Sequence, residues 1–249
     1  MNAAEHAINI GELSLALGGR QILRGISLLV APGERVALIG RNGAGKSSLL
    51  RVISAMIRAN GGHVQVLGKK FGPGLPPAEL RDLRADVGQV FQGLHLVNRL
   101  TALENVLMGC LGRERSLRTL LRLYPDPEIR LAQGILASVH MAHHAATRVD
   151  RLSGGERQKI AIARALMQQP RLLMIDEGTA SLDPYAAREI ATLIGNLARE
   201  HGLTLIAVVH SLPLLPLMAD RVVGLKDGTL ALDQPVDQLD QNLIESLYR

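Results

Sequence analysis

The sequence is poor in aromatic side chains and in cysteine. Its 249 residues include two Phe, three Tyr, no Trp and a single cysteine, Cys110. An apolar core must therefore be built from aliphatic side chains, and an internal disulfide is excluded. Cys110 lies within the apolar run VLMGCL, so we expect a buried thiol in a reducing compartment.

Long apolar runs are also lacking. No stretch approaches the roughly 20 residues that a membrane-spanning helix needs. The first residues, MNAAEHAINI, do not combine a cationic stretch with an apolar one, so we expect no secretory signal. With 47% hydrophobic residues, the chain is instead typical of a globular protein that buries a substantial core.

The net charge of +5 is compatible with nucleic acid or an anionic membrane surface as a partner. Arg115, Arg118 and Arg122 would share one face of a helix, with leucines opposite. A solvated helix face is the favoured interpretation, and a contact with lipid or a partner is the alternative. No aromatic residues accompany these arginines to stack bases, so we expect no nucleic-acid partner.

The first part of the chain predicts strands around a glycine-rich loop. Residues 8–30 alternate as strands do and are broken by Gly18 and Gly19, and residues 35–39 (RVALI) form a strand that leads through glycines into a helix. Another strand is expected at 62–67, and a charged helix near 78–86 follows a Gly/Pro-rich loop.

The middle of the chain is helical in pattern, and strands return after it. The helical segments lie between about 100 and 170, and the later apolar runs cover 171–175, 204–209 and 221–225. Apolar strands that alternate with helices predict a buried parallel sheet. We therefore expect one α/β domain over 1–249, with a helical insertion near 93–165.

Residues 40–47 fit the phosphate-binding pattern G-x-x-x-x-G-K-[ST]. The glycines allow successive backbone N–H groups to face phosphate oxygens, Lys46 adds a positive charge, and Ser47 offers a hydroxyl to Mg²⁺. A plain glycine-rich turn is the alternative. The residues expected at the nucleotide here are Gly40, Arg41, Asn42, Gly43, Ala44, Gly45, Lys46, Ser47 and Ser48.

Two acids end the apolar run 172–175. Asp176 and Glu177 are expected at the carboxyl edge of the sheet, where ligands bind in open α/β folds. Asp176 suits a Mg²⁺ shell, and Glu177 suits the general base that activates water. A helix-capping acid pair is the alternative interpretation.

A second glycine-rich segment, Ser153-Gly154-Gly155-Glu156, precedes the helical run RQKIAIARALMQQ. Such a segment is either a second anion-binding device or an ordinary helix cap. One chain with two such devices suggests that the second serves the nucleotide of another copy.

Together these residues resemble ABC transporter ATPases over nearly the whole chain. Ser153 to Glu156 is similar to the family signature, with Glu156 where many members have Gln. The resemblance implies a RecA-like core with an N-terminal antiparallel β region, ATP and Mg²⁺ as ligands, and a head-to-tail dimer of two copies.

The same resemblance assigns further residues. Gln92 matches the Q-loop glutamine, which contacts Mg²⁺ and senses the membrane subunit, and His210 matches the switch histidine at the γ-phosphate. Ser181-Leu182-Asp183 matches the D-loop. The implied catalytic residues are Lys46, Glu177 and His210, and the implied metal ligands are Ser47, Gln92 and Asp176.

Two further segments resemble phosphonate-import ATPases, namely FQGLHLVNRLTALENVLMGCLG and RSLRTLLRLYP. This resemblance implies membrane permeases as partners, a periplasmic solute-binding protein as an indirect partner, and a peripheral location on the cytoplasmic face of the cell membrane. An importer for phosphite, phosphate or an amino acid, a binding-only ATP switch and a soluble ABC-type regulator remain alternatives.

The chain departs from the family at three places. Leu17 stands where an aromatic usually stacks on adenine, and Gly178 stands where Pro commonly follows the glutamate. Gly93-Leu94-His95 replaces the usual Gln and aromatic after the Q-loop glutamine. The first departure bears on ATP affinity and the second on how firmly the backbone positions Glu177. The third bears on the contact that couples the ATPase to the membrane subunit.

Overall fold

A computed structural model describes residues 6–71, 76–114, 116, 119, 121–176, 178 and 182–248. Its larger sheet has six strands in the order β10-β9-β3-β8-β7-β6, all parallel except β10. Every residue of β3, β7 and β8 is buried, which is typical of a parallel sheet covered on both faces. The strands are β3 (Arg35–Ile39), β6 (Val87–Val90), β7 (Leu172–Ile175), β8 (Thr204–Val208), β9 (Arg221–Lys226) and β10 (Thr229–Pro235).

The smaller sheet is antiparallel, in the order β2-β1-β4-β5. Gly18 and Gly19, at φ of +56° and +78°, make the turn between its first two strands, because glycine adopts such angles without steric cost. The strands are β1 (Ile8–Leu17), β2 (Arg20–Val30), β4 (Gly61–Val66) and β5 (Lys69–Phe71).

Two apolar clusters lie on opposite faces of the larger sheet. Val36 and Leu38 of β3 join α1 (Lys46–Ile53) and the smaller sheet, whereas Ala37 and Ile39 join the helices of the other face. This split follows from the alternation of side chains along a strand. The strand β3 therefore anchors the loop that follows it in the middle of the fold.

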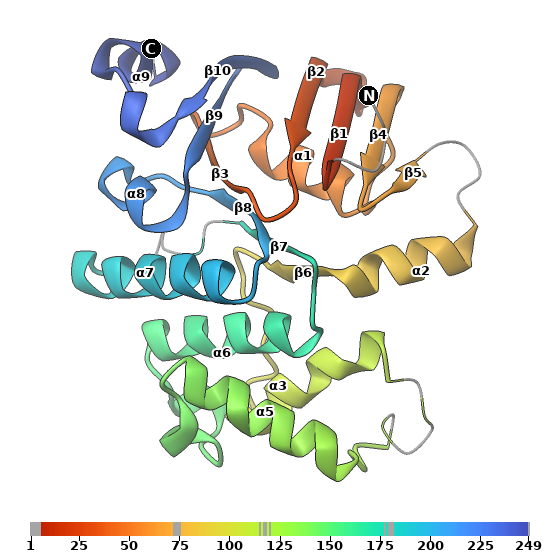
Figure 1. The fold of residues 1–249 in the computed structure, drawn as a ribbon, viewed down its shortest axis with the longest axis vertical. Helices are drawn as coiled ribbons and strands as arrows, with labels where there is room; N and C mark the ends of the chain where they lie inside the picture. The colour runs from red at the N-terminus through yellow and green to blue at the C-terminus, as the bar shows by residue number, and fades with distance from the viewer. Residues whose placement is uncertain are drawn as a thin grey trace.

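The middle of the chain forms a helical part (Figure 1). There α3, α5 and α6 pack together on the side of α7 away from the antiparallel sheet. Its elements are α3 (Ala102–Leu107), η1 (Met108–Gly112), α5 (Asp126–Ser138), η2 (Ala142–His144), η3 (Val149–Arg151) and α6 (Gly154–Met167). The remaining helices are α2 (Pro77–Asp86), α7 (Pro184–Glu200), η4 (Leu212–Leu214), α8 (Leu215–Met218), η5 (Val236–Gln238) and α9 (Gln241–Tyr248).

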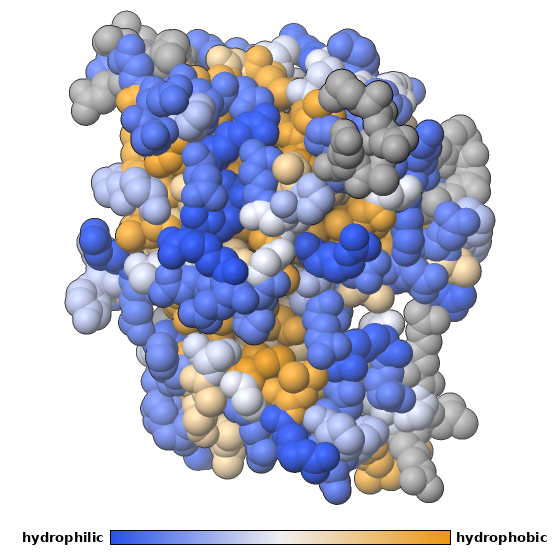
Figure 2. All heavy atoms as spheres, viewed as in Figure 1, coloured by the Kyte–Doolittle hydropathy of each residue, from blue (hydrophilic) through white to orange (hydrophobic). Residues whose placement is uncertain are grey.

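Polar residues cover most of the face drawn in Figure 2, and apolar residues reach it in separate patches. Cys110 is fully buried, as expected. Within the described ranges, no helix has the length and apolar character needed to cross a bilayer. The expected basic face cannot be placed, because Arg115 and Arg118 lie outside the described residues.

Candidate nucleotide-binding site

The loop of residues 40–45 starts where β3 ends and leads directly into α1. Gly40 has φ +137°, and a Cβ built on it would lie 2.2 Å from the carbonyl oxygen of Leu225. Gly45, at φ +106°, would place a Cβ 2.7 Å from Cδ2 of Leu23. The backbone angle favours glycine at both positions, and at Gly40 the fixed backbone oxygen also leaves no room for a side chain.

Lys46 is buried, and its side chain bridges two backbone carbonyls of the loop. Its Nζ donates hydrogen bonds to the carbonyl oxygens of Gly40, at 2.8 Å, and Arg41, at 3.0 Å. The α1 N-cap is Gly45, so no side chain caps the first turn of this helix. The first backbone N–H groups of a helix without a side-chain cap are available to an anion.

Ser47 and Asp176 meet below this loop, although 129 residues separate them in the chain. Ser47 Oγ donates a hydrogen bond to Asp176 Oδ1 at 3.1 Å. Asp176 directly follows β7, and its N–H donates to the carbonyl of Val90 at 2.9 Å, at the end of the neighbouring β6. The two strands therefore bring Asp176 and Gln92 to one sheet edge.

A cavity of about 520 Å³ opens at this edge. Three of its lining side chains carry positive charge, Arg20, Arg24 and Lys46, against one acid, Asp227. The electrostatics of the lining therefore favour an anion. The lining consists of Arg20, Gln21, Ile22, Arg24, Asn42, Gly43, Gly45, Lys46, Ser47, Ser48, Gln92, Asp227 and Gly228.

No pattern in the sequence indicated that Arg20, Arg24 and the Asp227-Gly228 turn would reach the cavity. Their approach depends on long-range pairing, since Arg24 N–H donates to Gly228 O at 2.8 Å. Leu17 is 43% exposed and is not among the lining residues. The Asp-Gly pair is a recognisable hairpin signal, but it predicts only a turn.

The hydroxyl, carboxylate and amide oxygens of Ser47, Asp176 and Gln92 suit a hard divalent cation. In the described part of the chain, no group of three or more His, Cys, Asp or Glu residues could hold a metal by itself. A Mg²⁺ ion at Ser47 and Asp176 would thus complete its shell with phosphate and water oxygens, as Mg²⁺ commonly does.

His210 follows β8 by two residues at the same sheet edge, where it is exposed and outside the cavity lining. Glu177 and Ser181 lie outside the described residues.

Asp183 accepts hydrogen bonds from the N–H groups of Tyr185 and Ala186 and so caps α7. At Gly178, an added Cβ would lie only 2.6 Å from Cγ2 of Ile175. A larger residue at this position would therefore clash with Ile175.

The segment Ser153–Glu156 begins α6 with a capping box. Ser153 N–H donates to Glu156 Oε2 at 2.7 Å, and Glu156 N–H donates to Ser153 Oγ at 3.4 Å. Ser153 and Gly154 are exposed, and none of residues 153–156 lines the cavity at the 40–47 loop. The segment therefore caps α6, as one interpretation of the sequence predicted. It also faces outward, away from the 40–47 loop of its own chain.

Hydrogen bonds from the N–H and hydroxyl of Ser153 lower the pKa of Glu156, and the charges of His144 and Lys159 act in the same direction, while partial burial opposes them. The carboxylate is thus ionised at neutral pH. Glu104 of α3, in a similar capping box with Thr101, also has a lowered pKa, caused first by the Thr101 N–H.

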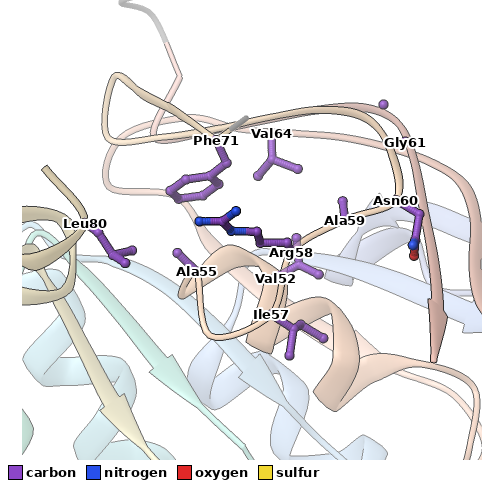
Figure 3. Close-up of a pocket in the computed structure, with 11 residues that line it drawn as sticks. Val52, Ala55, Ile57, Arg58, Ala59, Asn60, Gly61, Val64, Phe71 and Leu80 are labelled. Atoms are coloured by element: carbon purple, nitrogen blue, oxygen red, sulfur yellow. The ribbon is translucent and has the colours of Figure 1, made fainter. Parts of the chain in front are cut away.

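A separate cavity of about 260 Å³ lies beside the end of α1, between β4, β5 and α2. Figure 3 shows the Phe71 ring above the side chain of Arg58, with Leu80 facing them from α2. None of the residues predicted for the nucleotide site lines this cavity. It is therefore distinct from the site at the 40–47 loop.

Comparison with known proteins gives the family. The model described as "ABC transporter" matches residues 23–180. The phosphonates import ATP-binding protein PhnC of Stutzerimonas stutzeri is 40% identical over 252 aligned positions, which cover 100% of this chain and 90% of that protein. PhnC 2 of Haloarcula marismortui is 40% identical and covers 93% of this chain and 85% of its own.

Solved structures agree with this result. CbiO1 of Clostridium perfringens, part of the ABC transporter complex cbiONQ, aligns with a TM-score of 0.83 at 27% identity, over 94% of this chain and 90% of its own. The ATP-binding cassette MJ0796, in a dimeric post-hydrolysis state bound to ADP and Pi, aligns with a TM-score of 0.79 at 28% identity, over 92% of this chain and 98% of its own. The α/β fold expected from the sequence is confirmed, and the chain belongs to the ABC transporter family.

Proposed function

We propose that this chain is the ATP-hydrolysing subunit of an ABC importer that takes up phosphonate or a related phosphorus oxyanion. The observation that carries the ATPase assignment is the contact of Ser47 with Asp176 beneath the 40–47 loop. It joins a phosphate-binding loop to a metal-binding carboxylate at one sheet edge. The cargo rests on the relatives, which are named phosphonates import ATP-binding proteins.

The nucleotide's phosphates would lie against the 40–47 loop. Backbone N–H groups of the loop and of the first α1 turn would donate to phosphate oxygens, and Lys46 would exchange its two carbonyl partners for the β- and γ-phosphates. Arg20 and Arg24 lie at the same cavity and would add attraction for the polyanion.

Ser47, Asp176 and Gln92 are the proposed holders of Mg²⁺, directly or through water. The ion, when bound, neutralises charge on the β- and γ-phosphates. The backbone N–H of Asp176 is bonded to the Val90 carbonyl, and its carboxylate accepts a hydrogen bond from Ser47, so the protein orients this carboxylate before any ligand arrives.

Hydrolysis would proceed by in-line attack of water on the γ-phosphate. Glu177, which directly follows Asp176, is the proposed general base, and His210 is proposed to contact the γ-phosphate from the end of β8. Lys46 would balance the charge that develops on the transferred group.

A second copy of this chain is the proposed partner at the nucleotide. Ser153 to Glu156 face outward on α6, away from the cavity of their own chain. In a head-to-tail pair each would meet the nucleotide on the other copy's loop, and the MJ0796 cassette has been solved as a dimer.

A cleft of about 400 Å³ between the core and the helical part is the proposed permease contact. At its rim the Phe91 and His95 rings stack at 5.0 Å. Leu94 and His95 both have positive φ, and the Arg164 guanidinium donates to their carbonyls at 2.6 Å. Such consecutive strained residues beside Gln92 suit a coupling loop with two arrangements. A peripheral place on the cytoplasmic face of the membrane, and a periplasmic solute-binding protein as an indirect partner, complete the proposal.

Phosphate release by the purified chain with ATP and Mg²⁺ tests the ATPase assignment. Lys46→Ala should abolish turnover and weaken ATP binding, because the loop loses its buried cation. Undiminished turnover in that variant would contradict the assignment. Uptake by the chain reconstituted with its permease and solute-binding protein tests the cargo: phosphonate should be taken up and polar amino acids should not, and the reverse would assign another solute.

A further inference from the structure

The loop between α5 and α6 turns back onto the first turn of α6. There His144, the last residue of η2, places Nε2 at 3.1 Å from Glu156 Oε1. Its other ring nitrogen, Nδ1, lies 3.3 Å from Thr147 Oγ1. The imidazole is thus held on both sides, and one side is the glutamate of the signature segment.

Glu156 passes this contact on to Ser153. One carboxylate oxygen faces His144, while the other accepts the Ser153 N–H at 2.7 Å. The N–H of Glu156 in turn donates to Ser153 Oγ. A change at His144 therefore reaches the backbone and hydroxyl of Ser153 through one intervening side chain.

The carboxylate at position 156 also creates an electrostatic problem. A glutamate in the first turn of α6 is favourable for the helix itself, because its N-terminus is positive. If Ser153 faces the γ-phosphate of a second copy, however, the negative charge lies beside a polyanion. Lys159, a cation near Glu156, contacts Glu189 of α7 at 2.6 Å.

We propose that His144 is a positioning residue for the signature segment: its Nε2 holds the Glu156 carboxylate, and this carboxylate orients Ser153. The inference rests on the proposed function, since it requires Ser153 to meet ATP bound by another copy. A chain with glutamine at position 156 presents no carboxylate to His144. The contribution of His144 therefore depends on the glutamate.

The surroundings of His144 support its role as the partner of Glu156. The His143 ring lies beside it at 4.2 Å between centroids, tilted by 46°. The α5 helix packs against η2, and its ionisable residues are confined to positions 126–130, leaving 131–138 without charge. From α6, Glu156 contacts His144 directly, and Lys159 is the further charged group that acts on Glu156.

A double-mutant cycle on the full chain tests the proposal. His144→Ala should lower steady-state ATP turnover by about tenfold, the size of a lost hydrogen bond to a charged group. In a Glu156→Gln background, whatever its own rate, the same change should cost less than about twofold. His201→Ala is the matched control, because this exposed histidine at the end of α7 makes no contact with His144 or Glu156 among those described. Its turnover should equal that of the unmodified chain.

Two further substitutions separate positioning from packing. His144→Gln keeps a hydrogen-bond donor for the Glu156 carboxylate, so it should restore most of the turnover that His144→Ala loses. His144→Leu fills the space without a donor and should show the same loss as His144→Ala, which it replaces if the alanine variant fails to fold.

Binding of ATP to the separate monomers should be unchanged in His144→Ala, because its own 40–47 loop is intact. Equal losses with and without the Glu156→Gln substitution, or no rescue by His144→Gln, would overturn the inference while leaving the ATPase assignment in place. No phosphate release by the unmodified chain would instead overturn the proposed function, and the inference with it.

Discussion

Alanine at Gly40 tests the geometry of the phosphate-binding loop. The residue has φ +137°, and an added Cβ would lie 2.2 Å from the Leu225 carbonyl oxygen, a backbone atom of the neighbouring strand β9. The backbone strain alone costs about 1–3 kcal/mol. Relief of the clash requires β3 and β9 to separate, so we expect a total loss of roughly 3–5 kcal/mol in the free energy of unfolding.

The control is Gly68→Ala, in the turn between β4 and β5. Gly68 has φ +82°, but an added Cβ would meet nothing within 4 Å. It therefore carries the strain without the clash, and about 1–2 kcal/mol is expected. For a chain of this size, the midpoint temperature of thermal unfolding should fall by about 10 °C in Gly40→Ala and by about 4 °C in the control.

Differential scanning calorimetry measures both changes, and titration with a fluorescent ATP analogue measures the effect on binding. Gly40→Ala should also weaken nucleotide binding, whereas Gly68→Ala should not. Equal losses of stability in the two variants would refute the argument that the Leu225 carbonyl leaves no room for a side chain.

Two further predictions concern single side chains. Leu17→Tyr should tighten ATP binding by about fivefold, since stacking of an aromatic ring on adenine adds about 1 kcal/mol. A displacement titration measures the affinity, and an unchanged affinity would mean that position 17 does not reach the base. Burial raises the pKa of the Cys110 thiol to about 11, so at about pH 8 the native chain should react with a disulfide reagent far more slowly than the unfolded chain. Equal rates would contradict the buried position of this residue.

The strand–loop–helix around residues 35–53 could be predicted because its signals are local. An apolar run, a glycine pattern and a periodic helix follow one another within a short stretch of chain, and the structure has β3, the loop and α1 there. The helix at Pro77–Asp86 and the strands β1, β2, β4, β7, β8 and β9 were predicted for similar reasons, with ends shifted by a residue or two.

Three strands were not predicted. β5 (KKF) is short and charged, β6 (VGQV) has four residues and a glycine, and β10 is an edge strand, partly exposed, that ends at Pro235. Their strand conformation depends on pairing with neighbouring strands, since β6 pairs with β7 and β10 pairs with β9. Local propensity alone is too weak to indicate them.

The residues of the candidate site likewise fall into those that a local pattern indicates and those that long-range contacts bring in. The residues of the 40–47 loop could be named from their pattern, but Arg20 and Arg24 reach the cavity only through the hairpin at Gly228. The His144–Glu156 contact depends on a loop returning to α6, which no spacing indicates. The roles of Glu177 and His210, the Mg²⁺ ligands and the domain limits at 93–165 stay predictions.

Glu177→Gln tests whether Glu177 is the general base, by steady-state phosphate release with ATP binding measured on the same preparation. We expect turnover to be lost while ATP still binds, because glutamine keeps the size of the side chain but cannot accept the proton of the attacking water. ATP turnover at the rate of the unmodified chain would contradict the assignment of Glu177 as the base, and with it the proposed mechanism of hydrolysis.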